Sequence, residues 1–237
     1  MGFALAGADT HGDLAQGLAG GRSDAFQAGV YGRRYFGPAY VAGAAAFANH
    51  WMKTNRVAPL GDQLAASFNA QVFGGRLEVG DRFALPAPGA IGAMIGVTPY
   101  GALQAQSFHA GAYSESDLSG GGFALNHNAM NASDTRSELG ARFDDLTMLS
   151  GMPLVLRSRL AWAHDWVSNP AIGAVFQALP GAAFTVNGAA PPKDSALTTA
   201  GFELRPAPNW SLGAKFEGEF AARSQTYAGT GTLRYTW

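Results

Sequence analysis

Residues 210–220 read WSLGAKFEGEF, and this stretch decides the fold. Its even-numbered positions, from Trp210 to Phe220, are apolar or glycine, whereas its odd-numbered positions, from Ser211 to Glu219, are polar or glycine. Successive side chains of a β-strand point to opposite faces, so strict alternation over this length indicates a strand with one apolar and one polar face.

The same alternation recurs along the chain, for example in residues 138–143, 154–166 and 225–237. Most of these segments are close to the roughly 9–11 residues that a tilted strand needs to cross a bilayer. We therefore predict about ten strands, at residues 2–8, 24–35, 39–51, 64–83, 97–108, 137–146, 154–166, 196–204, 210–220 and 225–237.

The predicted strand at 64–83 is longer than the others, and its alternation changes phase midway. Phe68 and Val72 are apolar at even positions, whereas Leu77 and Val79 are apolar at odd ones. A β-bulge adds one residue to one strand and would restore a common apolar face. We therefore predict a bulge at Gly74-Gly75.

A second uncertain segment is 174–186, which reads AVFQALPGAAFTV. It fits either an extra hairpin that turns at Leu179-Pro180-Gly181 or a β-extension standing above a membrane. Each arm is too short to cross a bilayer. We therefore favour the extension, with residues 188–195 in the same outer loop.

Composition narrows the class of protein. Of the 237 residues, 14% are charged, against roughly 25% in an average soluble domain, and 32 are glycine. The net charge of −1 offers no basic field for nucleic acid, and the lack of cysteine excludes disulfides and Cys-ligated zinc. The sequence contains no run of about 20 apolar residues, the length that a membrane-spanning helix needs. Such a chain must either bury its apolar surface in a large core or turn it towards lipid.

Aromatic residues and connection lengths favour a transmembrane barrel, which has aromatic girdles, short periplasmic turns and long extracellular loops. A soluble β-sandwich, with its polar face in water, remains the alternative. Short connections are predicted at residues 36–38, 149–153 and 206–209. Longer polar connections are predicted at residues 53–63, 111–133 and 168–195. The aromatic residues at strand ends or beside turns are Tyr35, Phe36, Tyr40, Phe83, Tyr100, Phe143, Trp210, Tyr235 and Trp237.

In order and spacing, seven segments together resemble the C-terminal β-domain of classical monomeric autotransporters, the type V secretion proteins. The resemblance implies an all-β fold, an antiparallel up-and-down transmembrane barrel of twelve strands with an α-helix through its pore. That helix would join the barrel to an upstream passenger at the cell surface. The segments are AFQAGVYGRRYFGPAYVAGAAAF, FGGRLEVGDRF, VTPYGALQ, SELGARF, RSRLAWAHDW, TTAGFELRPAPNWSLGAKFEG and TGTLRYTW.

The resemblance aligns residues 2–8 with the third strand of the family. We therefore expect residues 1–237 to form one β-domain that is partial at its N-terminus. The passenger, the pore helix and the first two strands would be absent, in agreement with about ten strands rather than twelve.

The polar face of the strands would be the lumen of the barrel. Mixed charges there would keep a pore wet and hold the helix or a passing chain. The alternative is that these charges only pair with one another across neighbouring strands. The predicted lumen residues are Glu138, Arg142, Arg157, Arg159, Lys215, Glu217, Glu219 and Arg234.

The final strand is the second candidate site. In outer-membrane proteins a terminal aromatic strand is read by the barrel-assembly machinery, and strand addition supplies the physical basis for such recognition. The alternative is that these residues are lipid-facing girdle residues, and both roles are compatible. The residues concerned are Tyr227, Leu233, Tyr235 and Trp237.

No pattern in the sequence predicts catalysis, a cofactor or a metal site. The five histidines lack metal-binding spacing, and His164 and Asp165 would point to opposite faces. We expect an outer-membrane translocator or anchor domain of a Gram-negative bacterium. Its expected partners are outer-membrane lipid and lipopolysaccharide, the assembly machinery, and its own passenger and pore helix. The alternatives are a porin-like or adhesin barrel and a soluble β-sandwich binding module.

Overall fold

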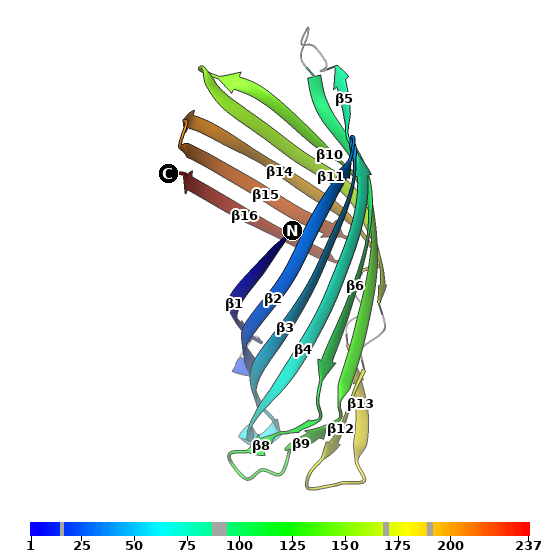
Figure 1. Cartoon of the computed structure of the whole chain (residues 1–237). Helices are drawn as coiled ribbons and strands as arrows, with labels where there is room; N and C mark the ends of the chain where they lie inside the picture. Colours follow the sequence, from blue (N-terminus) through cyan, green and yellow to red (C-terminus); the bar gives the residue numbers. More distant parts are fainter. Residues whose placement is uncertain (15–16, 87–93, 168–170, 189–191) are drawn as a thin grey trace.

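Ten long antiparallel strands form one strongly curled sheet, seen in the computed structural model in Figure 1. The structure describes residues 1–14, 17–86, 94–167, 171–188 and 192–237. The strands follow the order β1-β2-β3-β4-β6-β10-β11-β14-β15-β16. Their bounds are β1 (Gly2–Asp13), β2 (Ala19–Phe36), β3 (Ala39–Val57), β4 (Gln63–Asp81), β6 (Met94–Ala110), β10 (Met130–Leu149), β11 (Met152–Val167), β14 (Asp194–Ala207), β15 (Trp210–Ala221) and β16 (Ser224–Tyr235).

All ten predicted strands are present in the predicted order, so the all-β antiparallel fold is confirmed. The main sheet curls on itself (Figure 1), so the β-sandwich alternative is wrong. Among the described residues, β1 pairs only with β2, and β16 pairs only with β15. These two strands are therefore the edges of the main sheet. No helix of the described part of the chain is long and apolar enough to cross a membrane.

A second, smaller sheet stands at one end of the main one and has the order β13-β12-β9-β7. Its hairpin β12–β13 spans much of the segment 174–186, which confirms the extension and excludes two further crossings. Residues 189–191 of the predicted outer loop lie outside the described ranges. The bounds are β7 (Tyr113–Ser114), β9 (Leu125–His127), β12 (Ala171–Phe176) and β13 (Ala183–Asn187).

The opposite end of the sheet carries the predicted short turns. Gly37 and Gly151 adopt positive φ of 65° and 81°, the region that a residue without Cβ enters at little cost. One connection at this end is longer than a turn, because β5 (Phe83–Pro86) pairs with the start of β6. At the other end the predicted loop 53–63 is wrong in length. Strands β3 and β4 continue to Val57 and from Gln63, and the short 3₁₀ turn η2 (Pro59–Gly61) lies between them.

The predicted bulge at Gly74-Gly75 is wrong. The pairing of β4 runs without a register shift from Gln63 to Asp81 against β3, and from Ala70 to Gly80 against β6. The phase of the alternation changes for another reason. Near Gln63 the outer face carries polar side chains and the inner face apolar ones, whereas beyond Phe73 the outer face is apolar and the inner face is charged. The outer surroundings change there from water to lipid, while the strand itself stays regular.

The inner face of the sheet is concave. Arg142 of β10 donates a 2.6 Å hydrogen bond to the Tyr40 hydroxyl of β3, and Arg136 of β10 reaches Glu219 of β15 at 2.8 Å. In each case the two strands are separated by two others in the sheet. Neighbouring strands lie about 4.8 Å apart, so these side chains start three strand spacings from each other. They can meet only because the sheet curves towards this face.

The small sheet is fixed to the main one by a buried ion pair. Arg56, near the end of β3, donates two hydrogen bonds to Glu115, of 2.7 and 2.6 Å. The same carboxylate accepts the backbone N–H of Leu125 at 2.9 Å. Beside it the Tyr113 ring stacks on Phe68 of β4, with ring centroids 4.0 Å apart. Burial by itself would raise the pKa of Glu115, but the bonds from Arg56 and Leu125 outweigh it and hold that pKa below its usual value.

This pair predicts a pH-dependent small sheet. A carboxyl group whose pKa is lower in the folded state stabilises that state above its unfolded pKa, and the stabilisation is lost as pH falls through the folded pKa. Glu115→Gln should weaken the small sheet by about 1–3 kcal/mol at neutral pH and remove this acid step. Hydrogen exchange of β7 and β9, measured from neutral to acid pH in detergent, checks this. Glu217→Gln, which lies outside the small sheet, is the control and should leave the pH profile unchanged. Equal pH profiles for wild type and Glu115→Gln would contradict the assignment of the acid step to Glu115.

Candidate functional site: the charged concave face

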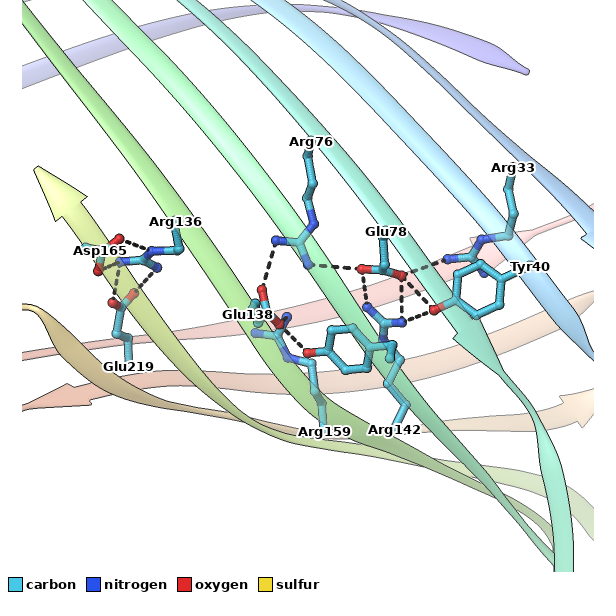
Figure 2. Close-up of polar contacts among 11 residues, drawn as sticks. Arg33, Tyr40, Arg76, Glu78, Arg136, Glu138, Arg142, Arg159, Asp165 and Glu219 are labelled. Carbon is cyan, nitrogen blue, oxygen red and sulfur yellow. Dashed lines mark hydrogen bonds and ion pairs between the residues drawn. The ribbon is translucent and has the colours of Figure 1, made fainter.

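Two buried carboxylates lie at the centre of the concave face, as Figure 2 shows. Glu78 of β4 is 6% exposed and Glu138 of β10 is 2% exposed. A buried carboxylate is stable only when ion pairs and hydrogen bonds compensate for its lost hydration. The neighbouring arginines and tyrosines supply these bonds.

The Glu78 carboxylate accepts hydrogen bonds from three neighbouring side chains. It accepts one hydrogen bond from the Tyr40 hydroxyl at 2.7 Å, two from Arg142 at 2.8 Å, and one from Arg76 at 3.0 Å. Arg33 approaches the same carboxylate at 3.8 Å, and its guanidinium lies 4.4 Å from the centre of the Tyr40 ring. These contacts join strands β2, β3, β4 and β10 through one carboxylate (Figure 2).

Glu138 continues the same network. It accepts hydrogen bonds from Arg76 at 2.8 Å and from Arg159 at 3.2 Å, and the Tyr100 hydroxyl also donates to it. Arg76 therefore bridges the two carboxylates. We call the eight residues that make these contacts the central network: Arg33, Tyr40, Arg76, Glu78, Tyr100, Glu138, Arg142 and Arg159.

A glycine makes room for one of the two tyrosines of the network. Gly80 lies opposite Tyr40 on one side and opposite Tyr100 on the other. A Cβ atom at Gly80 would lie 2.6 Å from an atom of the Tyr40 ring. The glycine thus leaves space for the Tyr40 ring, whose hydroxyl group donates to Glu78.

A second cluster lies further towards the end that carries the small sheet. Arg136 donates to Asp165 of β11 at 2.6 and 2.9 Å, and to Glu219 of β15 at 2.8 and 3.3 Å. One guanidinium thereby links strands β10, β11 and β15, as Figure 2 shows.

The register places all eight predicted charged residues on the concave face. Glu138, Arg142 and Arg159 belong to the central network, and Glu219 contacts Arg136. Lys215 forms an ion pair at 2.8 Å with Glu217, two residues further along the same strand, and Arg157 reaches Glu203 at 3.4 Å. Arg234 lies opposite Ser211 near the end of β16.

Sequence reasoning did not include Arg76 and Glu78 among the lumen residues, although their alternation with Leu77 and Val79 is the signal that could have found them. It also placed Tyr40 and Tyr100 in the aromatic girdle, which is wrong. Both side chains are buried on the concave face, at 4% and 5% exposure. The phenolic hydroxyl explains this, because a carboxylate acceptor is available inside and lipid offers none.

The convex face has the opposite character. Its exposed side chains include Leu77 on β4, Leu103 on β6 and Leu139 on β10. The indole of Trp162 and the imidazole of His164 both bond to Asp194, at 3.0 and 2.9 Å, near the end that carries the small sheet. Trp162 and His164 lie on the convex face and Asp165 lies on the concave one, as the alternation predicted.

The predicted terminal residues also lie on or follow the convex face. Tyr227, Leu233 and Tyr235 share that face of β16 and are exposed, and Trp237 follows the strand. Tyr235 lies opposite Trp210, with ring centroids 4.9 Å apart.

An apolar convex face, a charged concave face and ten antiparallel strands in one curled sheet are the features of the wall of an outer-membrane β-barrel. The sequence profile of the family described as "Autotransporter beta-domain" matches residues 1–217. The chain therefore belongs to the autotransporter β-domain family, the outer-membrane translocator barrels of Gram-negative bacteria.

Two comparisons with individual proteins accompany the family match. The chain is 24% identical over 206 residues to an "Extracellular serine protease" of Serratia marcescens, covering 86% of this chain and 19% of that protein. The chain thus spans about a fifth of the length of that relative. It is also similar to the crystal structure of the β-domain of the Bordetella autotransporter BrkA, with 11% identity, a TM-score of 0.33, and coverage of 99% of this chain and 98% of that one.

The central network predicts a large cost for removing one of its carboxylates. Glu78→Ala would remove the acceptor that Arg76, Arg142 and Tyr40 share, leaving Arg76 with Glu138 and Arg142 with the Tyr40 hydroxyl. Breaking a buried ion pair from one side costs about 3–5 kcal/mol. We expect a loss of about 3 kcal/mol in the free energy of unfolding, because the arginines keep some contact with water. Denaturant unfolding of the detergent-folded chain, followed by tryptophan fluorescence, measures it.

The half-exposed pair Lys215–Glu217 is the matched control. Lys215→Met should cost less than about 1 kcal/mol, as for other exposed ion pairs. Equal losses in Glu78→Ala and Lys215→Met would show that the network contributes no more than a surface pair.

Proposed function

We propose that this chain is the membrane-embedded domain that anchors an N-terminal passenger and supports its export to the cell surface. The observation that carries the proposal is the pairing of one apolar convex face with one charged concave face along the same ten strands. Such a barrel wall is stable in lipid and offers a hydrated interior to a polypeptide.

Within this proposal the charges of the concave face have two roles. Glu138, Arg142 and Arg159 hold neighbouring strands together through the central network. Arg157, Lys215 and Glu217 are more exposed and keep the interior hydrated. Pairing across neighbouring strands and hydration of the interior, the two roles considered for these charges from the sequence, therefore apply to different residues of the same face.

We further propose that the domain carries out no catalysis and holds no cofactor or metal. Its partners are outer-membrane lipid, lipopolysaccharide, the barrel-assembly machinery and its own passenger and pore helix. The Serratia relative is named as a protease, but that name describes a protein about five times longer than the matched chain. The kind of passenger therefore does not follow from this relative.

Folding in detergent tests the membrane proposal. The chain refolded in micelles should run on SDS gels as a compact band that shifts on boiling, because a hydrogen-bonded barrel wall resists SDS until it is heated. In buffer without detergent no compact form should appear, since the convex face is apolar. A chain that is folded and soluble in buffer alone would refute the proposal.

The terminal strand generates a separate prediction. Tyr235→Ala and deletion of Trp237 should reduce assembly into the outer membrane of a Gram-negative host severalfold, measured as the heat-modifiable fraction. Refolding of the same variants in micelles should be nearly unchanged, because the assembly machinery is absent there. Thr236→Ala, on the other side of the strand, is the control. Equal losses in cells and in micelles would indicate lipid-facing girdle residues without a signalling role.

A further inference from the structure

The concave face contains a cavity of about 820 Å³ beside the turn at Gly37. Its walls come from β2, β3, β6, β10, β11, β14 and β15 and from the segment around Arg82. Two carboxylates, Asp144 and Glu217, line it. The cationic side chains that line it are Arg33, Arg82, Arg142, Arg157, Arg159 and Lys215.

Six cationic side chains line the cavity, against two carboxylates in its lining and the two buried carboxylates Glu78 and Glu138 behind its wall. The side chains of Glu78 and Glu138 are 7% and 3% exposed. Those of Arg33 and Arg157 are 46% and 59% exposed. Arg82 and Lys215 are each paired with a comparably exposed carboxylate, Asp144 and Glu217. The excess of positive charge that water meets in the cavity therefore comes from Arg33 and Arg157.

Two guanidinium groups in the cavity wall, those of Arg157 and Arg33, make only long polar contacts among the described residues. Arg157 makes one contact of 3.4 Å with Glu203, and Arg33 lies 3.4 Å from the Tyr35 hydroxyl and 3.8 Å from Glu78. Arg159 has a buried Nε with no hydrogen-bond partner. That buried Nε has no surface open to the cavity, whereas the exposed N–H groups of Arg157 and Arg33 can donate to an acceptor that enters it.

We propose that this cavity is a carboxylate-binding site that holds acidic side chains of a polypeptide lying in the barrel. The inference rests on the proposed function, because it places a polypeptide in the interior. A carboxylate matches the planar fork of N–H donors that each arginine presents. A basic segment would be repelled by the same groups, and a neutral one would leave the donors unpaired.

A binding measurement on the detergent-folded chain tests the site. Fluorescence anisotropy, in a non-ionic detergent at low salt, measures the binding of a labelled hexaglutamate peptide to the chain. A labelled hexalysine peptide of opposite charge is the comparison. Acetate added as competitor separates free carboxylate from peptide-borne carboxylate. The peptide should bind, and the affinity should fall as salt rises.

The variants locate the site. Arg157→Gln should weaken hexaglutamate binding about tenfold and Arg157→Glu further, because a charged hydrogen-bond donor to the ligand is lost or reversed. Arg157 has one long contact, so both variants should keep the heat-modifiable band. Arg34→Glu is the matched control, because the register places Arg34 on the convex face, opposite Val41.

Each outcome decides between the two proposals. Three results for the folded protein would overturn the carboxylate site and leave the translocator proposal standing. These are binding of neither peptide, equal binding of hexalysine and hexaglutamate, and equal effects of Arg157→Glu and Arg34→Glu. Competition by millimolar acetate as strong as by the peptide overturns the polypeptide ligand in favour of free carboxylates. A chain that gives no heat-modifiable band overturns both proposals.

Discussion

The fold depends on one constraint, which is that the backbone of every strand must satisfy its hydrogen bonds within the sheet while its outer side chains meet lipid. Once a strand is paired on both sides, only the alternation of its side chains can distinguish outside from inside. Each strand of this chain therefore carries two independent patterns, an apolar one for lipid and a polar one for the interior. The register connects the patterns of neighbouring strands, so a shift by one residue would turn Glu78 and Glu138 towards lipid.

The same constraint explains how much of the structure could be predicted from the sequence. Strand number, order and the faces of Lys215 and Glu219 follow from alternation alone, and they were predicted. The phase change in β4 was attributed to a bulge, because alternation records only what surrounds a strand. A change from water to lipid at Phe73 leaves the same mark as an inserted residue. Only the register of the neighbouring strands distinguishes the two causes.

The central network could not be predicted for a different reason. Its contacts join strands that are far apart in sequence, such as Tyr40 with Arg142, and the partners depend on how tightly the sheet curls. Alternation assigns a residue to a face but says nothing about which residue of a distant strand it meets. Tyr40 and Tyr100 show the limit clearly, because a tyrosine at a strand end suits a lipid interface as well as a buried acceptor.

The small side chains of one strand lie on the concave face that the long arginine side chains cross. On the concave face of β3, Ala42, Ala44, Ala46 and Ala48 follow one another at every second position, whereas the convex face of the neighbouring strands carries Val30, Phe73 and Leu77. The arginine contacts then cross the concave side and hold the curvature of the sheet, so that the curl depends on residues of β2, β3, β4 and β10 as well as on any contact at the sheet edges.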